Sequence, residues 1–222
     1  GSALSFNNIN PADPNVWGQY ATAGDVDMEA MGNGLTIAFW VQWTQNNTNW
    51  QGIINRRGSW SGANMMWRID KNPGTGEISF EREGAGGRVA TNLVQNNWHY
   101  IVATYDIASG TTKMYNNGVR ISTATGFTYG TGTNSGFKLG CNNDNASEFF
   151  CGKIDDVKIY NYARSAAQIA QEYADIMGVS VCNREGTDNM RFDTNGDCRV
   201  DIIDFAELAK DWLNDNRIYP QQ

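Results

Sequence analysis

The residues best spaced for chemistry form an acidic run near the C-terminus, Asp193-Thr-Asn-Gly-Asp-Cys-Arg-Val-Asp-Ile-Ile-Asp204. Side-chain oxygens fall at its first, third, fifth, ninth and twelfth positions, and the seventh residue offers its main-chain carbonyl. Calcium takes about six to eight oxygen ligands, and a loop of this length leading into a helix can wrap them around one ion. A solvated acidic turn is the alternative. The spacing predicts a calcium site with the ligands Asp193, Asn195, Asp197, Arg199 (through its carbonyl), Asp201 and Asp204.

Aromatic and guanidinium side chains gather in a second region, between residues 46 and 68. Trp50 and Trp60 stand in segments rich in Asn, Ser and Gly, where no alternation of apolar residues accounts for them. Indole rings can stack on sugar faces, and the forked donors of arginine suit hydroxyl, carboxylate or sulfate groups. An equally open alternative is that both indoles fold back over a sheet edge. The region predicts a ligand-binding face made of Trp50, Trp60, Arg56, Arg57 and Arg68.

Three glutamates, Glu77, Glu81 and Glu83, lie at period two, the spacing that places side chains on one face of a strand. Paired carboxylates in such positions could act as acid and base on a glycosidic bond. The neighbouring Arg82 and Arg88 favour charged glutamates instead, which suits no general acid. No catalytic residue is therefore predicted, and a solvated, salt-bridged face is expected.

The four cysteines allow three pairings. Cys141 and Cys151 flank a short loop, and Cys182 and Cys198 flank the acidic motif, so we predict the disulfides Cys141–Cys151 and Cys182–Cys198. A zinc site would need closely spaced cysteines or several histidines, which the sequence lacks. Disulfides indicate an oxidising compartment and hence a secreted, extracellular or cell-surface protein.

Composition narrows the class of protein further. The chain has 222 residues, with 24 acidic against 17 basic side chains and a formal charge of −7. No Lys/Arg-rich run is present to neutralise a phosphate backbone, so nucleic acid is not an expected partner. No apolar stretch approaches the ~20 residues that cross a bilayer, so membrane insertion is not expected.

Short apolar or alternating runs separated by Gly, Asn and Asp predict consecutive antiparallel strands up to about Tyr162. The strongest turn signal is Asn117-Gly118, a pair that adopts the positive φ angles of a two-residue hairpin. Trp67 alternates with apolar neighbours, which places its ring in the core. The expected strands cover residues 35–43, 52–55, 65–70, 78–83, 99–105, 113–115, 119–122, 137–139 and 152–159.

Helix signals come late in the chain. Ser165 with Gln168 three residues on predicts a capping box, and Gly178 predicts the end of that helix. A second helix is expected over residues 202–213, where Phe205, Leu208, Ala209 and Trp212 share one face that needs a packing partner.

Three stretches resemble the laminin G-like branch of the concanavalin A-like jelly-roll family: Leu35-Thr-Ile-Ala-Phe-Trp-Val41, Asn97-Trp-His-Tyr-Ile-Val-Ala-Thr-Tyr-Asp106 and Gly152-Lys-Ile-Asp-Asp-Val-Lys-Ile-Tyr-Asn161. Their order and spacing match as well, and the resemblance covers residues 3–177. It implies an all-β fold, a jelly-roll sandwich of two antiparallel sheets. The family includes lectins, accessory modules of polysaccharide-degrading enzymes, adhesion domains and some hydrolases.

The resemblance also implies roles for single residues. It places Trp98 at a core position and gives His99 a structural role inside a strand. Family members often bind calcium where the first and last strands meet, which makes Asp156 a candidate ligand, together with the side chain of Asn7 or Asn8. A carboxylate that accepts loop amide hydrogen bonds is the alternative for Asp156.

With the following Phe205-Ala-Glu-Leu-Ala-Lys-Asp-Trp-Leu213, the calcium motif resembles one repeat of a dockerin, a module of secreted bacterial glycan-active proteins. Dockerins pair two such repeats, and this chain has one. The sixth loop position, usually Gly, is Cys198, whose left-handed turn would need a disulfide to hold it. We expect residues 178–222 to be a calcium-stabilised cap or anchor first, and a docking module for a cohesin-like or cell-surface protein second.

Together these features predict a secreted, noncatalytic module over residues 3–177 that binds a polysaccharide or another glycan, followed by a short calcium loop and helix. Two alternatives stay open: an extracellular adhesion or assembly domain that binds protein, and a glycoside hydrolase or lyase of the same fold.

Overall fold

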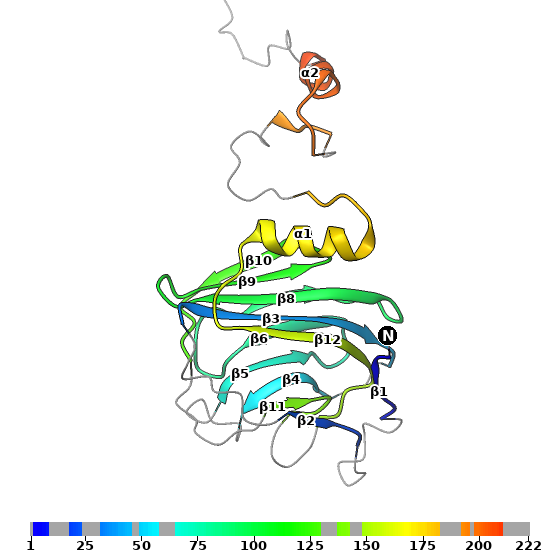
Figure 1. Cartoon of the computed structure of the whole chain (residues 1–222), viewed down its shortest axis with the longest axis vertical. Helices are drawn as coiled ribbons and strands as arrows, with labels where there is room; N and C mark the ends of the chain where they lie inside the picture. The colour runs from blue at the N-terminus through cyan, green and yellow to red at the C-terminus, as the bar shows by residue number, and fades with distance from the viewer. Residues whose placement is uncertain are drawn as a thin grey trace, which may run out of the picture.

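The computed structural model describes residues 2–8, 18–23, 32–45, 49–57, 65–129, 137–142, 148–182, 192–195 and 198–210. Within these residues the chain forms two six-stranded sheets, whose neighbouring strands pair antiparallel, and two helices (Figure 1). The predicted all-β sandwich is confirmed.

The two sheets interleave along the sequence, because successive strands often belong to opposite layers. Sheet A contains, in spatial order, β1 (Leu4–Phe6), β12 (Gly152–Tyr160), β3 (Gly34–Trp43), β8 (Trp98–Asp106), β9 (Thr111–Asn116) and β10 (Val119–Thr125). Sheet B contains β2 (Ala21–Ala23), β11 (Phe137–Leu139), β4 (Gln51–Arg57), β5 (Met65–Lys71), β6 (Glu77–Glu81) and β7 (Val89–Asn92).

Apolar side chains from the facing sides of both sheets form the main core. Alternate residues of β3 and β8 contribute to it, as do Trp67 and Ile69 of β5, so the predicted core position of Trp67 is confirmed. Since side chains alternate along a strand, Arg68 and Asp70 must lie on the other, outer face of sheet B. The core therefore determines which side chains of sheet B face outward.

Helix α1 (Ala166–Met177) packs on the outer face of sheet A. Ile169 and Ala166 are buried against Tyr100 and Tyr115, and Figure 1 shows the helix running alongside β9 and β10. The capping box of Ser165 and Gln168 is confirmed, as is the left-handed stop at Gly178. Helix α2 (Ile202–Ala209) begins at Ile202, as the sequence predicts, with Asp201 as its N-cap, and its described part ends before residue 211.

The predicted strands all occur, with ends that differ by a few residues. The hairpin at Asn117-Gly118 is confirmed, with φ angles of 53° and 80°. His99 is buried and bridges the main-chain nitrogen of Val94 and the side chain of Asn116, which agrees with a structural role. The core position expected for Trp98 is wrong, because its side chain is exposed at the start of β8.

Candidate functional site

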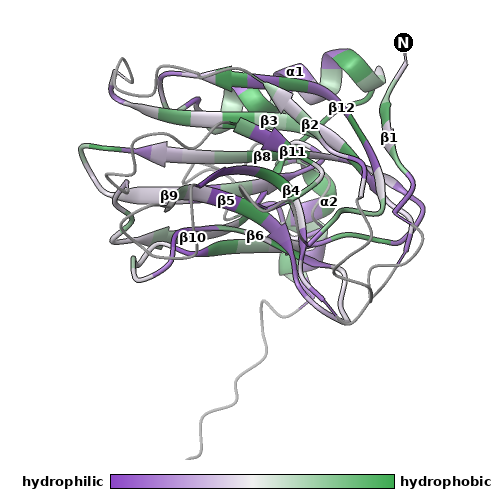
Figure 2. Ribbon diagram, turned by 90° about the horizontal axis from the view of Figure 1, so that it is seen from below, coloured by the Kyte–Doolittle hydropathy of each residue, from purple (hydrophilic) through white to green (hydrophobic). Residues whose placement is uncertain are grey.

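The outer face of sheet B brings charged and amide side chains from distant segments into one row. Lys138 of β11 pairs with Asn55 of β4, Asn55 pairs with Arg68 of β5, and Arg68 pairs with Glu81 of β6. Residues paired across strands project from the same face, so the four side chains form a line across the sheet. Figure 2 looks at the molecule from the side where β4, β5 and β11 lie in front, and shows hydrophilic stretches on β4 and β5.

An ion network runs along this row. Arg68 contacts Asp70 at 3.2 Å and Glu81 at 2.9 Å. Arg88 then bridges Glu81, at 3.3 Å, and Glu77, at 2.5 Å. Arg57 contacts Glu148 at 3.3 Å and donates to the main-chain oxygen of Asn142. We call these seven charged residues the outer-face ion network: Arg57, Arg68, Asp70, Glu77, Glu81, Arg88 and Glu148.

The members of the network differ in how far their side chains are exposed to solvent. The side chains of Asp70, Arg57 and Arg68 are 0%, 1% and 4% exposed, whereas those of Glu81 and Glu148 are 15% and 26% exposed. Burial raises the pKa of Asp70 to about 6, although the guanidinium groups of Arg68 and Arg57 act in the opposite direction. Asp70 is thus a structural member of the network, and the glutamates are the members that reach solvent.

Trp50 lies over this face. The guanidinium carbon of Arg68 is 5.1 Å from the centroid of the Trp50 ring, a cation–π contact, and the indole is half-buried. Trp50 therefore does fold back over the sheet, as one interpretation of the sequence held, and it covers Arg68. The ring is held in place from beneath by a guanidinium that is itself fixed by two carboxylates.

The other predicted ligand-binding residues do not all lie on the outer face of sheet B. Arg57 and Arg68 belong to the network, while Trp60 lies outside the described residues. Arg56 pairs with Phe137 and Trp67, which are core residues, so its side chain starts on the inner side of sheet B. The sequence analysis missed Glu148, which only the fold brings beside Arg57, and Asp70, which alternation along the predicted strand already places on the same face as Arg68.

The carboxylates of β6 are engaged with protein partners. Glu77 and Glu81 share the outer face, while Glu83 follows the end of the strand and does not continue the period-two row. Ser79, between them, donates its hydroxyl to Glu81 at 3.2 Å. With two arginines already bound to Glu81, this face suits hydrogen bonding to hydroxyl groups better than proton transfer.

The structure does not gather the ligands expected for a second calcium. Asp156 lies on the β12 bulge with φ +49° and contacts Lys158 at 2.7 Å. Asn8 instead donates to the carbonyl of Phe150, before β12 begins, and accepts from the main-chain nitrogen of Gln19. Six residues of strand span roughly 20 Å, so Asn8 and Asp156 lie far apart. The expected grouping of Asp156 with Asn8 is therefore wrong, and Asn7 accompanies Asn8 beside Gln19.

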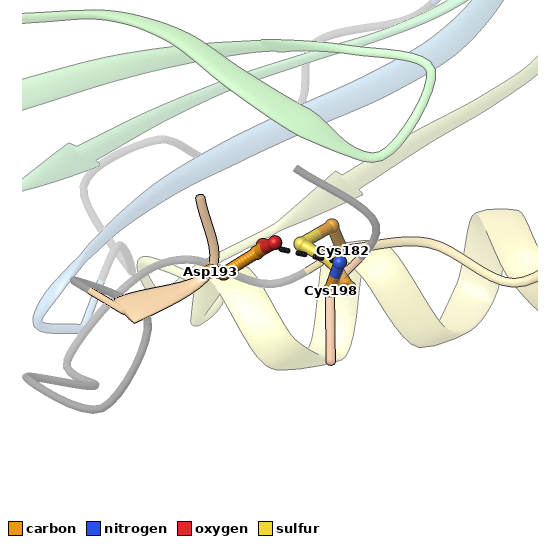
Figure 3. A group of neighbouring side chains, drawn as sticks. All are labelled: Cys182, Asp193 and Cys198. Carbon is orange, nitrogen blue, oxygen red and sulfur yellow. Dashed lines mark hydrogen bonds between the residues drawn. A yellow bond between two sulfur atoms is a disulfide. The ribbon is translucent and has the colours of Figure 1, made fainter. Parts of the chain in front are cut away.

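In the acidic motif, the carboxylates of Asp193 and Asp204 accept hydrogen bonds from main-chain N–H groups of the same loop. Both oxygens of Asp204 accept main-chain N–H bonds, from Thr194 and Asn195 on one side and from Asp201 on the other. These bonds, that of Asp201 first, lower the pKa of Asp204. Asp193 accepts from the nitrogen of Cys198 at 3.1 Å, as Figure 3 shows.

The donor set of this loop fits a hard cation. A carboxylate has about four lone-pair sites, so Asp193 and Asp204 could bind an ion while keeping these N–H bonds. Of the remaining predicted ligands, Asp201 caps α2 by accepting from Ile203, Asn195 and Arg199 are exposed, and Asp197 lies outside the described residues. The described carboxylates of this loop form no close group of three; the group found nearby is Cys182, Asp193 and Cys198, whose sulfurs are bonded to each other.

One predicted disulfide is confirmed and the other is wrong. Cys182 and Cys198 are bonded, and Cys198 adopts φ +70°, so a disulfide does hold the left-handed residue at the sixth loop position. Cys141 and Cys151 are buried free thiols. Cys141 follows β11 of sheet B and packs with Phe149, whereas Cys151 precedes β12 of sheet A and directs its sulfur to the carbonyl of Asn8. The chain brings the two segments together, since Phe150 donates its N–H to the Gly140 carbonyl at 2.9 Å, but the two sulfurs have different neighbours, which the sequence separation does not show.

Comparison with known proteins assigns the family. Residues 15–170 match Laminin_G_3, described as the concanavalin A-like lectin/glucanases superfamily. This is more than half of the chain, which therefore belongs to that family. A search of curated protein sequences found no match.

Solved structures share the fold at low sequence identity. The NanB sialidase of Streptococcus pneumoniae aligns with a TM-score of 0.58 and 19% identity, over 76% of this chain and 27% of that chain. A putative carbohydrate binding protein from Bacteroides ovatus aligns at 0.53 and 18%, over 76% and 46%. The botulinum neurotoxin type G receptor binding domain aligns at 0.50 and 18%, over 66% and 39%. This chain thus spans less than half of each of these structures, and the likeness shows the fold alone.

Within the described residues, no helix is both long and apolar enough to cross a membrane.

Proposed function

We propose that this chain is a noncatalytic carbohydrate-binding module of a secreted protein, and that it binds glycan on the outer face of sheet B. The observation that carries the proposal is Trp50, whose ring is fixed over this face by Arg68 and is still partly open to solvent. A preoriented aromatic ring with hydrogen-bonding groups around it is the usual construction of a small-molecule site. The Bacteroides ovatus neighbour, titled a putative carbohydrate binding protein, supports this class of ligand.

The absence of cleavage is part of the proposal. The sialidase neighbour shows that catalytic proteins contain this fold, so the fold does not exclude an enzyme. Glycosidases need one carboxylic acid that donates a proton and one carboxylate opposite it. Glu81 is bound by two arginines, and Asp70, whose pKa is raised, is fully buried and cannot touch a substrate.

The proposal includes two domains, a sandwich over residues 3–177 and a calcium-binding tail over residues 178–222. The loop spacing, the inward carboxylates of Asp193 and Asp204, and the disulfide at Cys198 support calcium as the ion. When bound, calcium would supply charge and coordination that hold the loop against α2.

A second candidate function, adhesion to or assembly with another protein, is favoured by the tail. Helix α2 exposes Ile202, Ile203, Phe205 and Leu208, an apolar surface of the kind found at protein interfaces. A cohesin-like or cell-surface protein is the partner class under this alternative.

The test is a glycan array probed with and without calcium, followed by Trp50→Ala. If the ring is an anchor, this change weakens binding by about 1–3 kcal/mol without unfolding the sandwich. Trp98→Ala is the matched control, because it removes an exposed indole from sheet A, and it leaves binding unchanged. Absence of any glycan ligand, or equal losses in the two variants, contradicts the proposal. Release of reducing ends or unsaturated products that Glu81→Gln abolishes would establish an enzyme instead.

A further inference from the structure

The outer-face ion network presents carboxylates to solvent and keeps two of its arginines below them. The side chains of Arg57 and Arg68 are 1% and 4% exposed, against 26% for Glu148, 15% for Glu81 and 34% for Glu77. Arg88 is the more exposed guanidinium, and it is held between Glu77 and Glu81. Arg88, at 41%, is the most exposed member, so the solvent-facing groups of the network are three carboxylates and one guanidinium, and each of the three arginines is already bound to a protein carboxylate.

The formal charges of the described residues on this face balance. Four carboxylates, those of Asp70, Glu77, Glu81 and Glu148, stand against Arg57, Arg68, Arg88 and the Lys138 ammonium, which lies near the Tyr20 ring. The stretches of sequence that adjoin β4, β5 and Glu148, residues 46–48, 58–64 and 143–147, contain no Lys or Arg, and the whole chain carries −7. No excess of positive charge is available to attract a polyanion.

These observations select among classes of sugar. Hydroxyl groups donate well to carboxylates, and such charge-assisted bonds are among the stronger ones that a neutral ligand can form. A uronic acid or sulfated sugar would bring its anionic group toward Glu77, Glu81 and Glu148, and like charges placed together cost several kcal/mol. Resting on the proposed function, we propose that the site binds neutral sugars: Trp50 stacks on the ring face, and Glu81 and Glu148 accept from sugar hydroxyls and exclude acidic glycans.

The experiment compares each soluble neutral polysaccharide that the glycan array identifies with its own carboxymethylated derivative, at low and high NaCl. We expect the neutral polymer to bind about tenfold or more tightly than the derivative at low salt, with little change for the neutral polymer as salt rises. Glu81→Gln and Glu148→Gln keep the shape of each side chain and remove its charge. Each should weaken binding of the neutral polymer and narrow its advantage over the derivative.

Glu207→Gln changes an exposed glutamate of α2 and is the control. It should change neither the binding of the neutral polymer nor its advantage over the derivative. Circular dichroism identifies any variant that does not fold, and Glu148→Gln, at the more exposed position, then replaces Glu81→Gln in the comparison. Tighter binding of the carboxymethylated polymer, weakened by salt, overturns the neutral-sugar inference and leaves the carbohydrate-binding proposal standing. Binding of neither polymer nor any array glycan overturns both.

Discussion

Asp70 belongs to the outer-face ion network and also affects the stability of the fold. Its carboxylate is fully buried on β5 and contacts Arg68, and the charges that influence it come from Arg57 of β4 and from Glu148. The side-chain amide of Asn55 on β4 donates to the main-chain oxygen of Cys141 at 3.0 Å, and its proximity acts to lower the pKa of Asp70. Burial prevails over the two arginines, so the pKa of Asp70 lies above its ordinary value in the folded protein.

The raised pKa of Asp70 predicts a specific pH dependence of stability. The folded-state pKa, about 6, lies above the ordinary value of 3.8, so the folded chain holds a proton that the unfolded chain releases between these values. The contribution of Asp70 is therefore fully present below about pH 4, and it declines as pH rises to 6. We expect Asp70→Asn to remove that decline, measured as the free energy of unfolding by urea at a series of pH values. Parallel curves for the wild type and the variant would contradict this assignment.

Single residues could be predicted where local geometry determines them, and not where distant segments meet. Asn117-Gly118 and Cys198 were identified correctly because a positive φ is a property of one position in a turn or loop. The unbonded state of Cys141 and Cys151 depends on where each sulfur points, Cys141 toward Phe149 and Cys151 toward the Asn8 carbonyl, which no local pattern records. Glu148 likewise reaches Arg57 across 91 residues of sequence.

At the scale of elements, α1 is the clearest case of sequence and packing in agreement. Its capping box and its left-handed end fix the length of the helix, and Ala166, Ile169 and Ala170 form its buried side. Glu172, on the same helix, binds Arg164 and Lys158. Burial alone would raise the pKa of Glu172, but these hydrogen bonds outweigh it and lower the pKa to about 2. Charge and apolar contact thus hold the helix to sheet A together.

Docking of α1 should contribute substantially to stability through Ile169. This side chain is fully buried among aromatic rings of sheet A, so Ile169→Ala leaves a cavity and should cost about 2–5 kcal/mol. Ile176→Ala removes the same groups from an exposed position of the helix and should change stability by less than about 0.5 kcal/mol. Chemical unfolding of both variants tests the difference; equal losses would show that the helix does not pack on the sheet as described.

The strands that the sequence did not predict share a physical character. β1 and β2 have three residues each and β7 has four, so their alternation gives little signal, although the sequence does predict β11, which also has three residues. β1 pairs with β12, about 150 positions later, so its partner defines it more than its own residues do. The long strands β3 and β8, by contrast, carry apolar residues along most of their length, and the sequence predicts them almost to their ends.

At the scale of the whole molecule, the sandwich and the tail depend on different sources of stability. The sandwich buries a continuous core between its sheets. Within the described tail residues 192–195 and 198–210, Asp204 is buried, whereas the apolar side chains of Ile202, Ile203 and Phe205 are exposed. A segment that buries so little apolar surface needs a covalent or metal link, and the Cys182–Cys198 disulfide is one such link.

Calcium should be the second link, and its removal should loosen the tail without unfolding the sandwich. Because the loop carboxylates meet around an ion only when the chain is folded, binding adds to folding free energy by mass action, about 2.7 kcal/mol at a calcium concentration 100 times the Kd. Hydrogen exchange should show α2 amides protected in calcium and unprotected in chelator, with β3 and β8 unchanged. Asp193→Asn keeps an acceptor for the Cys198 N–H but removes the charge, so it should weaken calcium binding in titration calorimetry, whereas Glu207→Gln should not. Protection of α2 that is the same in calcium and in chelator would show that the disulfide and the N–H bonds to Asp204 suffice, and that the loop has no need of a metal.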